Sequence, residues 1–574
     1  MTYREEYERW LASDVLSAQE KEELRSIAGD EKEIENRFYG PLEFGTAGLR
    51  GIMGVGWHNM NIHIIRHATQ AFAEVILEEG EQQAARGVAI DFDCRNHSHE
   101  FAMAAAEVMA ANGIPVRIFD SLRPTPELSF AVREYDCIAG INVTASHNPA
   151  AYNGYKVYWA GGAQLPPKHA AKIAAKMEQI DLFAGIRRME FYEAEQQGLI
   201  TIMSEDTDER FLARVLNISV DEDCVRNNEK FTMVYTPFHG CGYKLIPEVL
   251  HRIGLKNLHC EPKQMVIDGN FPTVESPNPE NPEGFYLAVD LADQVNADFI
   301  LGSDPDADRV GLMVRNDEGK FIPLSGNQTG ALFLDYYIQA LKRAGRLPEH
   351  PVALKTIVST DLVKTIAETN GVEIFNTFTG FKFMAEKKNQ LEWDKQGEVI
   401  WAFEESYGYM VGDYVRDKDA VTAAMLLTEM ACWHSAQGKT VYQALQDLYE
   451  KYGAYQEHTL NLVMPGLDGL EKMADLMKEL REQAPKEIGG TKVAQYRDYR
   501  DGSIRNADGS EGGTMELKGS NVLEFNLENG SKILVRPSGT EPKVKVYLLV
   551  HSDTMEQAKK DLAAYNEWAE GLRR

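Results

Sequence analysis

Three aspartates, Asp304, Asp306 and Asp308, lie two residues apart directly after an apolar run at 299–302. Carboxylates at this spacing repel one another unless a cation lies between them. The pattern therefore predicts a hard, oxygen-ligated metal ion, most plausibly Mg²⁺ completed by a phosphate oxygen. Arg309 follows the third aspartate and suits an anion held at the metal. The alternative interpretation is a solvated acidic turn that holds no ion.

A second loop, 144–149, follows a strand-like run at 138–143 and carries Ser146. This position places a hydroxyl at the C-terminal end of a strand, where open α/β sheets bind their ligands. Ser146 lacks the flanking glycines of a serine-hydrolase elbow, and the neighbouring His147 is expected to point away from it. The loop therefore does not predict an acyl-transfer triad. An ordinary polar turn is the alternative.

Two later loops carry polar groups of other kinds. Glu404 and Ser406 end a β-run and can point the same way in extended backbone, which suits adjacent sugar hydroxyls. The last loop offers a planar fork of donors, two hydroxyls, an ammonium group and a glycine that lets backbone N–H groups approach a phosphate. Its residues are Arg536, Ser538, Gly539, Thr540 and Lys543. The alternatives are an exposed acidic turn and a basic hairpin loop.

The elements that must position these loops follow an α/β pattern. After a helical stretch at 5–38, strand-like runs at 87–93 and 115–120 flank a helical run at 98–112. The same alternation returns at 230–302 and at 352–403, which predicts three consecutive mixed α/β domains. The C-terminal part has strands at 524–526, 532–535 and 544–550 and then a helix at 554–572, which predicts a smaller α+β domain.

These patterns give four predicted domains, each with one of the loops: 1–205, 206–318, 319–460 and 461–574. The last begins with a helical stretch at 466–486 and a Gly- and Asp-rich segment at 489–513 that is typical of a connector.

Composition limits the function classes. With 574 residues, 44% hydrophobic and 26% charged, the chain is expected to fold rather than remain disordered. A formal net charge of −28 argues against nucleic acid and anionic membranes as partners. Six scattered cysteines form no Cys-x-x-Cys pair, and no run of eighteen apolar residues occurs. We therefore expect a cytoplasmic protein without zinc or thiol redox chemistry.

Taken together and in this order, the four loops resemble the motifs of the α-D-phosphohexomutase superfamily. The glycine-rich segment 44–51 is similar to the opening motif of the same family, so the resemblance spans essentially the whole chain. Residues 379–382, together with 404–408 and 412–421, resemble the branch that contains phosphoglucomutases and phosphopentomutases. Phe403 departs from the glycine or cysteine that many relatives have there, and we expect it to alter packing rather than chemistry.

The resemblance implies four domains around a central cleft and an isomerase that acts as an intramolecular phosphotransferase. It would interconvert glucose 1-phosphate and glucose 6-phosphate through a phosphoserine, with glucose 1,6-bisphosphate as intermediate and activator. Ser146 would be the phosphoserine, and its phosphate would join Asp304, Asp306 and Asp308 around one Mg²⁺ per chain. Lys156 and then His147 are the candidates for the general base.

The remaining family roles concern binding. Arg50 and Arg309 would contact the reacting phosphate. The sugar would be bound by Glu404 and Ser406, with Thr379, Lys382 and Lys418 near them. The phosphate that is not reacting would be held by Arg536, Ser538, Gly539, Thr540 and Lys543.

Several alternatives stay open at this point. Phosphomannomutase or phosphopentomutase activity would use the same loops with another sugar. A metal-dependent sugar-phosphate phosphatase would use the same acids and release inorganic phosphate. A non-catalytic sugar-phosphate sensor is the third alternative, and the joint presence of a serine loop and a metal loop counts against it. In each case the partners are small sugar phosphates, and the chain is expected to be a monomer or a weak homo-oligomer.

Overall fold

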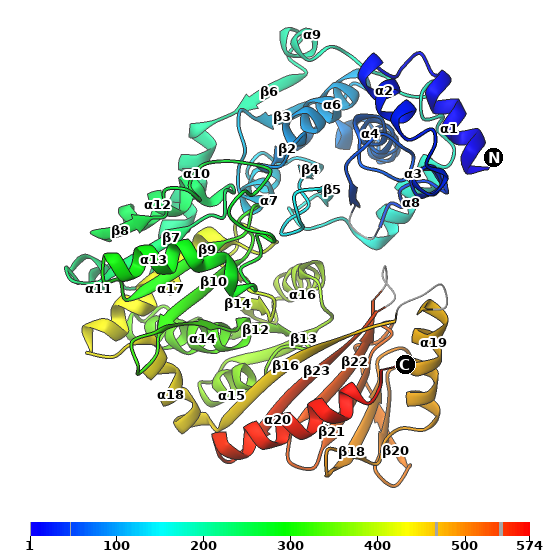
Figure 1. The fold of residues 1–574 in the computed structure, drawn as a ribbon. Coiled ribbons are helices and arrows are strands. Elements are labelled where there is room, and N and C mark those ends of the chain that lie inside the picture. The colour runs from blue at the N-terminus through cyan, green and yellow to red at the C-terminus, as the bar shows by residue number, and fades with distance from the viewer. Residues whose placement is uncertain (1, 46–47, 465–468, 539–542, 574) are drawn as a thin grey trace. The chain divides into compact units, whose positions relative to one another are not determined.

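The computed structural model describes residues 2–45, 48–464, 469–538 and 543–573 (Figure 1). Its contacts divide the chain into two compact units, each described by itself. The first comprises Met1–Ser325, Lys388–Gln390 and Ser406–Gly438, and the second comprises Gly326–Lys387, Leu391–Glu405 and Lys439–Arg574. Among the described residues, no helix is long and apolar enough to cross a membrane.

The first unit begins with three short helices and a six-stranded sheet in the order β1-β5-β4-β2-β3-β6. Strands β2 and β4 pair in parallel and are buried along their whole length, as a sheet covered on both faces requires. The strands are β1 (Gly48–Ile52), β2 (Val88–Phe92), β3 (Val116–Phe119), β4 (Ala139–Val143), β5 (Tyr152–Trp159) and β6 (Ile200–Met203).

Helices of this part of the first unit pack on the sheet and on one another. The apolar helix α4 contacts α6, and α7 contacts β2 and β4. The helices are α1 (Tyr3–Ala12), α2 (Ala18–Ser26), α3 (Glu31–Phe38), α4 (Ile62–Glu78), α5 (Glu81–Ala84), α6 (Ser98–Ala111), α7 (Thr125–Glu134), α8 (Pro167–Met177) and α9 (Phe191–Gln196). The predicted helical stretch at 5–38 is confirmed as α1–α3.

The first unit holds a second sheet in the order β11-β10-β9-β7-β8, with β7, β8 and β9 parallel. Its strands are β7 (Thr232–Thr236), β8 (Asn257–Cys260), β9 (Phe299–Ser303), β10 (Val310–Arg315) and β11 (Phe321–Leu324). The helices are α10 (Glu205–Ile218), α11 (Glu222–Arg226), α12 (Gly242–Arg252), η1 (Pro282–Phe285), α13 (Tyr286–Gln294) and α17 (Ala420–Ala436). Strand β15 (Gly408–Val411) approaches this sheet, because Gly408 forms a bridge with Arg309.

The second unit contains parallel strands in the order β13-β12-β14 and an antiparallel C-terminal sheet in the order β16-β23-β22-β21-β18-β19-β20, with β17 on β18. The parallel strands are β12 (Pro351–Thr356), β13 (Glu373–Thr377) and β14 (Glu398–Glu404). Their helices are α14 (Gly326–Arg343), α15 (Leu362–Thr369), α16 (Phe381–Asp394) and α18 (Val441–Tyr452).

The C-terminal sheet has its own helices, and α20 lies along β16 and β23 (Figure 1). The strands are β16 (Ala454–Val463), β17 (Glu487–Ile488), β18 (Thr491–Asp498), β19 (Ser503–Asn506), β20 (Glu511–Thr514), β21 (Leu523–Leu527), β22 (Lys532–Pro537) and β23 (Lys543–Ser552). The helices are α19 (Gly469–Glu482) and α20 (Met555–Glu570).

The predicted fold class is confirmed: three mixed α/β sheets precede an α+β C-terminal part. The segment 489–513 is a correction, because it forms β18, β19 and β20 rather than a connector. Its glycines at 490, 502 and 509 have positive φ and occupy turns. Val493 and Tyr496 both reach the core, because an irregularity after Val493 shifts the register of β18. Strand β11, which pairs with β10, lies beyond the predicted boundary after 318, and β16 spans the predicted boundary after 460. The domain limits stay predictions.

Candidate active site

The serine loop follows β4 and turns sharply at Ser146, which has φ +52°. Its backbone N–H donates to Thr144 Oγ1 over 2.8 Å, and the residue is only 4% exposed. The Oγ of Ser146 lies 3.2 Å from His147 Nδ1 and 3.2 Å from Asp304 Oδ2. The expectation that His147 points away was wrong, because the left-handed backbone breaks the alternation of extended chain. The structure therefore brings the hydroxyl, an imidazole and the aspartate loop together.

Arg95, which the sequence analysis missed, holds this loop in place. The residue is 3% exposed and follows β2, and its Nε lies 3.2 Å from Asp93 Oδ2. Its guanidinium donates to four backbone carbonyl oxygens, those of Ser146, Asn148, Pro149 and Tyr152. Four acceptors on one rigid cation fix the path of the loop more firmly than a lysine could. The signal that could have revealed it is the Asp-x-Arg pattern at the end of a buried strand.

The aspartate loop fits a cation. The three carboxylates are buried, and one oxygen of each lies within 4.8 Å of the others. Oδ1 of Asp304 accepts the backbone N–H groups of Asp308 and Arg309 over 3.1 and 3.0 Å. Oδ1 of Asp306 and Oδ1 of Asp308 are buried and accept no hydrogen bond from the described residues. Burial and the charges of its two neighbours raise the pKa of Asp304 well above its usual value. A bound cation would interact with the oxygens that accept no hydrogen bond and would offset the repulsion among the three carboxylates. An all-oxygen donor set suits Mg²⁺.

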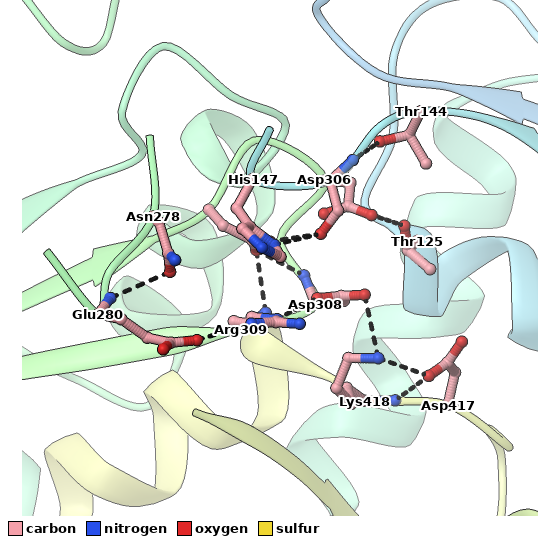
Figure 2. Close-up of polar contacts among 12 residues, drawn as sticks. Thr125, Thr144, His147, Asn278, Glu280, Asp306, Asp308, Arg309, Asp417 and Lys418 are labelled. Carbon is pink, nitrogen blue, oxygen red and sulfur yellow. Dashed lines mark hydrogen bonds and ion pairs between the residues drawn. The ribbon is translucent and has the colours of Figure 1, made fainter. Parts of the chain in front are cut away.

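Two lysines face the aspartates. Lys156 Nζ on β5 lies 2.7 Å from Asp306 Oδ2 and 3.6 Å from Asp308 Oδ2. Lys418 Nζ lies 3.3 Å from Asp308 Oδ2 and 3.2 Å from Asp417 Oδ1, as Figure 2 shows. Lys418, expected near the sugar, thus lies against the aspartate loop. Burial would lower the pKa of Lys156, but the charges of Asp306 and Asp308 outweigh it and raise that pKa.

Two arginines and His147 complete the site of the first unit. Arg50, on β1, donates from Nη1 to Asn148 Oδ1 over 3.1 Å. Arg309 donates from Nη1 to Glu280 Oε1 over 2.9 Å (Figure 2). Burial, together with the positive charges of Arg309 and Arg50, holds the pKa of His147 well below its usual value. The imidazole beside Ser146 is therefore neutral.

In the second unit, Glu404 lies at the end of β14 and is 4% exposed. Its Oε1 accepts the backbone N–H of Gly380 over 2.6 Å, next to Thr379 and close to the start of α16, which carries Lys382. Burial lowers the pKa of Lys382. These residues of the predicted sugar loops are thus gathered in one place.

The expected extended backbone between Glu404 and Ser406 was wrong. Residues 405–407 form a turn, and Tyr407 has φ +66°. Ser406 belongs to the first unit, whereas Glu404 belongs to the second. Phe403 stacks on Trp401 with 4.7 Å between ring centroids, so its observed contact is one of packing.

The predicted phosphate loop follows β22. Arg536 is partly exposed, and its Nη1 lies 3.4 Å from the hydroxyl of Tyr547. The backbone N–H of Ser538 donates to the carbonyl oxygen of Lys543 over 2.8 Å, which closes the base of the loop. Gly539 and Thr540 lie outside the described residues.

The sequence matches four family models in chain order. They are described as phosphoglucomutase/phosphomannomutase α/β/α domain I at residues 41–183, domain II at 209–319 and domain III at 325–452, and the C-terminal domain at 461–564. A phosphoglucomutase of Staphylococcus haemolyticus is 33% identical over 533 residues, which cover 92% of this chain and 94% of the relative. A phosphoglucomutase of Staphylococcus aureus strain MSSA476 is 35% identical over 529 residues, which cover 90% and 91%.

Among solved structures, the fold is similar to that of the exocytosis-sensitive phosphoprotein pp63/parafusin, a phosphoglucomutase from Paramecium, in its open form. The TM-score is 0.67 at 18% identity, with 93% of this chain and 94% of that chain covered.

Proposed function

Since the chain belongs to the phosphoglucomutase/phosphomannomutase family, we propose that it is a phosphoglucomutase. It interconverts glucose 1-phosphate and glucose 6-phosphate through phosphorylated Ser146 and bound glucose 1,6-bisphosphate. The observation that carries the proposal is the 3.2 Å between Ser146 Oγ and Asp304 Oδ2, which joins a nucleophile to a buried acidic cluster. A sugar-phosphate sensor would need no such pairing.

Asp304, Asp306 and Asp308, with an oxygen of the phosphorylated serine, are the proposed ligands of one Mg²⁺. When bound, the ion would neutralise the oxygens of the transferring phosphoryl group. Arg309 and Arg50 would bind the same group from the protein side, because both lie by the serine loop and carry a fork of donors. Arg95 would keep Ser146 in line with the acceptor hydroxyl by fixing the loop.

We assign the general base to His147 in preference to Lys156, which reverses the order expected from the sequence. Lys156 forms an ion pair with Asp306 and is held in its charged form, so it is better suited to stabilise negative charge. The His147 ring is neutral and lies beside the serine oxygen. A phosphate bound between Arg50 and Arg309 would offset the charges that lower the pKa of His147, which brings the imidazole toward the range of an effective base.

The other half of the cycle needs groups that accept the sugar in two orientations. After the first transfer, the bisphosphate turns over so that its second phosphate faces Ser146. Glu404 and Ser406, with Thr379 and Lys382, are the proposed contacts for the sugar. Arg536, Ser538 and Lys543, with Gly539 and Thr540, are the proposed contacts for the phosphate that is not reacting.

A coupled assay on glucose, mannose, glucosamine and ribose 1-phosphates, each with and without its bisphosphate, tests the proposal. We expect glucose 1-phosphate to give the highest kcat/KM and glucose 1,6-bisphosphate to activate the enzyme. A parallel assay for inorganic phosphate separates mutase from phosphatase. Release of phosphate at the rate of substrate loss, without glucose 6-phosphate, would overturn the mutase assignment.

A further inference from the structure

The side chain of Asp306 is held by a buried pair of polar residues from the first sheet and its helix. We propose that Asn142 and Thr125 form a hydrogen-bond relay that orients the Asp306 carboxylate toward the metal ion. This inference rests on the metal site of the proposed function. It concerns two positioning residues to which neither the four loops nor the family comparison assigns a role.

The relay is defined by three contacts. Asn142 Nδ2, on β4, donates to Thr125 Oγ1 over 2.8 Å. Thr125 Oγ1, at the start of α7, donates to Asp306 Oδ2 over 2.9 Å, as Figure 2 shows. The backbone N–H of Thr125 donates to the carbonyl oxygen of Asp306 over 2.8 Å. The three residues are at most 1% exposed, so water cannot replace these bonds.

The direction of the relay follows from the number of protons available. A threonine hydroxyl has one proton, and Asp306 when ionised can only accept. If Asn142 were turned so that its oxygen faced Thr125, the hydroxyl proton would go to Asn142. Two oxygens would then face each other at 2.9 Å without a proton between Thr125 and Asp306. The amide nitrogen of Asn142 must therefore donate to Thr125. The Thr125 hydroxyl then directs its own proton toward Asp306 Oδ2 in a hydrogen bond.

The relay selects which oxygen of Asp306 is available to an ion. Oδ2 receives both the Thr125 hydroxyl and the ammonium group of Lys156, the latter over 2.7 Å. Oδ1 is buried and accepts no hydrogen bond from the described residues. With Oδ2 held by two donors, the carboxylate cannot rotate freely, and Oδ1 is the atom presented to a cation. Partners of this kind, behind the ligand, tune metal affinity in many metalloproteins.

Thr125→Val and Thr125→Ser separate the relay from simple packing. Valine keeps the shape and the backbone bond to Asp306 but removes the hydroxyl, whereas serine keeps the hydroxyl. The affinity of each full-length protein for Mn²⁺ is measured by EPR titration, at a phosphorylation state matched by intact mass. Unfolding is followed in EDTA, so that a loss of fold is recognised without metal.

We expect Thr125→Val to weaken Mn²⁺ binding about 10- to 100-fold and Thr125→Ser to stay within about threefold of wild type. A Thr125→Val, Asn142→Leu double variant should bind Mn²⁺ no more weakly than Thr125→Val alone, because Asn142 acts through the hydroxyl. Equal affinity of Thr125→Val and wild type would overturn the relay, and so would equal losses in the valine and serine variants. Absence of Mn²⁺ binding by the wild-type protein would overturn the metal site itself and the relay with it.

Discussion

The groups assigned to phosphoryl transfer and those assigned to substrate recognition are held in different ways. In the first unit, Asp306 and Asp308 of the buried aspartate loop form ion pairs with Lys156 and Lys418. In the second unit, Glu404 is held by the backbone N–H of Gly380, and the partly exposed Arg536 touches a tyrosine hydroxyl at 3.4 Å. The groups assigned to phosphoryl transfer contact one another, whereas Glu404 and Arg536 lie near the ends of two separate strands.

This difference has a kinetic consequence. A preorganised cluster acts on the transition state, so changes to it should lower kcat. Groups on separate strand ends bind ground state and transition state alike, so changes to them should mainly raise KM. Substitutions in the two sets of groups test this division.

Ser146→Ala should lower mutase turnover by at least about 1,000-fold, because it removes the proposed carrier of the phosphoryl group. The fold should be unchanged, since the buried loop is fixed by Arg95 through backbone oxygens. A coupled glucose 1-phosphate assay measures turnover, and circular dichroism checks the fold. If a preparation of the variant free of host enzyme had near wild-type turnover, the assignment of Ser146 as the phosphoserine would be contradicted.

Asp306→Asn should lower kcat about 100- to 1,000-fold and weaken the dependence on Mg²⁺. The amide keeps the volume of the carboxyl but loses the charge that faces the ion and Lys156. Wild-type enzyme treated with EDTA is the matched control: it should lose activity to a similar degree and recover on addition of Mg²⁺. An unchanged Mg²⁺ titration in the variant would contradict the assignment of Asp306 as a ligand.

Arg536→Ala should raise KM for glucose 1-phosphate about 10- to 100-fold with a smaller effect on kcat, because the guanidinium group is the proposed contact for the phosphate that is not reacting. The KM of Arg536→Lys should lie between those of wild type and Arg536→Ala, since lysine keeps the charge but loses the bidentate geometry. Arg500→Ala removes an exposed charge from the same sheet region and is the control. A fall in kcat at constant KM would contradict this assignment and would place Arg536 among the groups that act in phosphoryl transfer.

The sequence predicts the loops better than the contacts that hold them. Asp304 and Ser146 follow strands, Glu404 and Arg536 lie near the ends of strands, and a strand end in an α/β pattern is visible in one sequence. The segment 489–513 was wrongly predicted to be a connector, because glycines are as common in hairpin turns as in linkers.

Arg95 and Thr125 were not predicted. Arg95 donates to backbone oxygens, and Thr125 donates to the carboxylate of a proposed metal ligand, Asp306. Such contacts depend on which strands are neighbours. The left-handed turn at Ser146, which brings His147 to the serine oxygen, is likewise a property of the folded backbone. Sequence patterns thus identify groups that bear chemistry, and tertiary contacts identify the groups that orient them.

The smallest effect is expected at a half-buried acid of the second unit, Glu457 on β16. Burial, opposed by a hydrogen bond from Thr360 and supported by the charge of Asp361, raises its pKa to about 7. Here a half-buried carboxyl is suited to a proton, whereas the aspartates of the first unit are suited to a cation. A raised pKa in the folded state means that its contribution to stability is full below about pH 4.3 and is lost as the pH rises through 7.

Glu457→Gln should therefore match wild type in unfolding free energy near pH 4 and exceed it by roughly 1–3 kcal/mol at pH 8. The difference arises because the amide never ionises, while the wild-type carboxyl must ionise at high pH in a site that is partly shielded from water. Urea unfolding of both proteins from pH 4 to 8 measures it, with Glu450→Gln on α18, an exposed glutamate, as the matched control. Mutase activity should be unaffected, because stability and turnover are carried by different groups. A pH-independent difference between Glu457→Gln and wild type would show that the carboxyl is ionised in the fold, and the contrast between a proton-bearing and a cation-bearing region would fail.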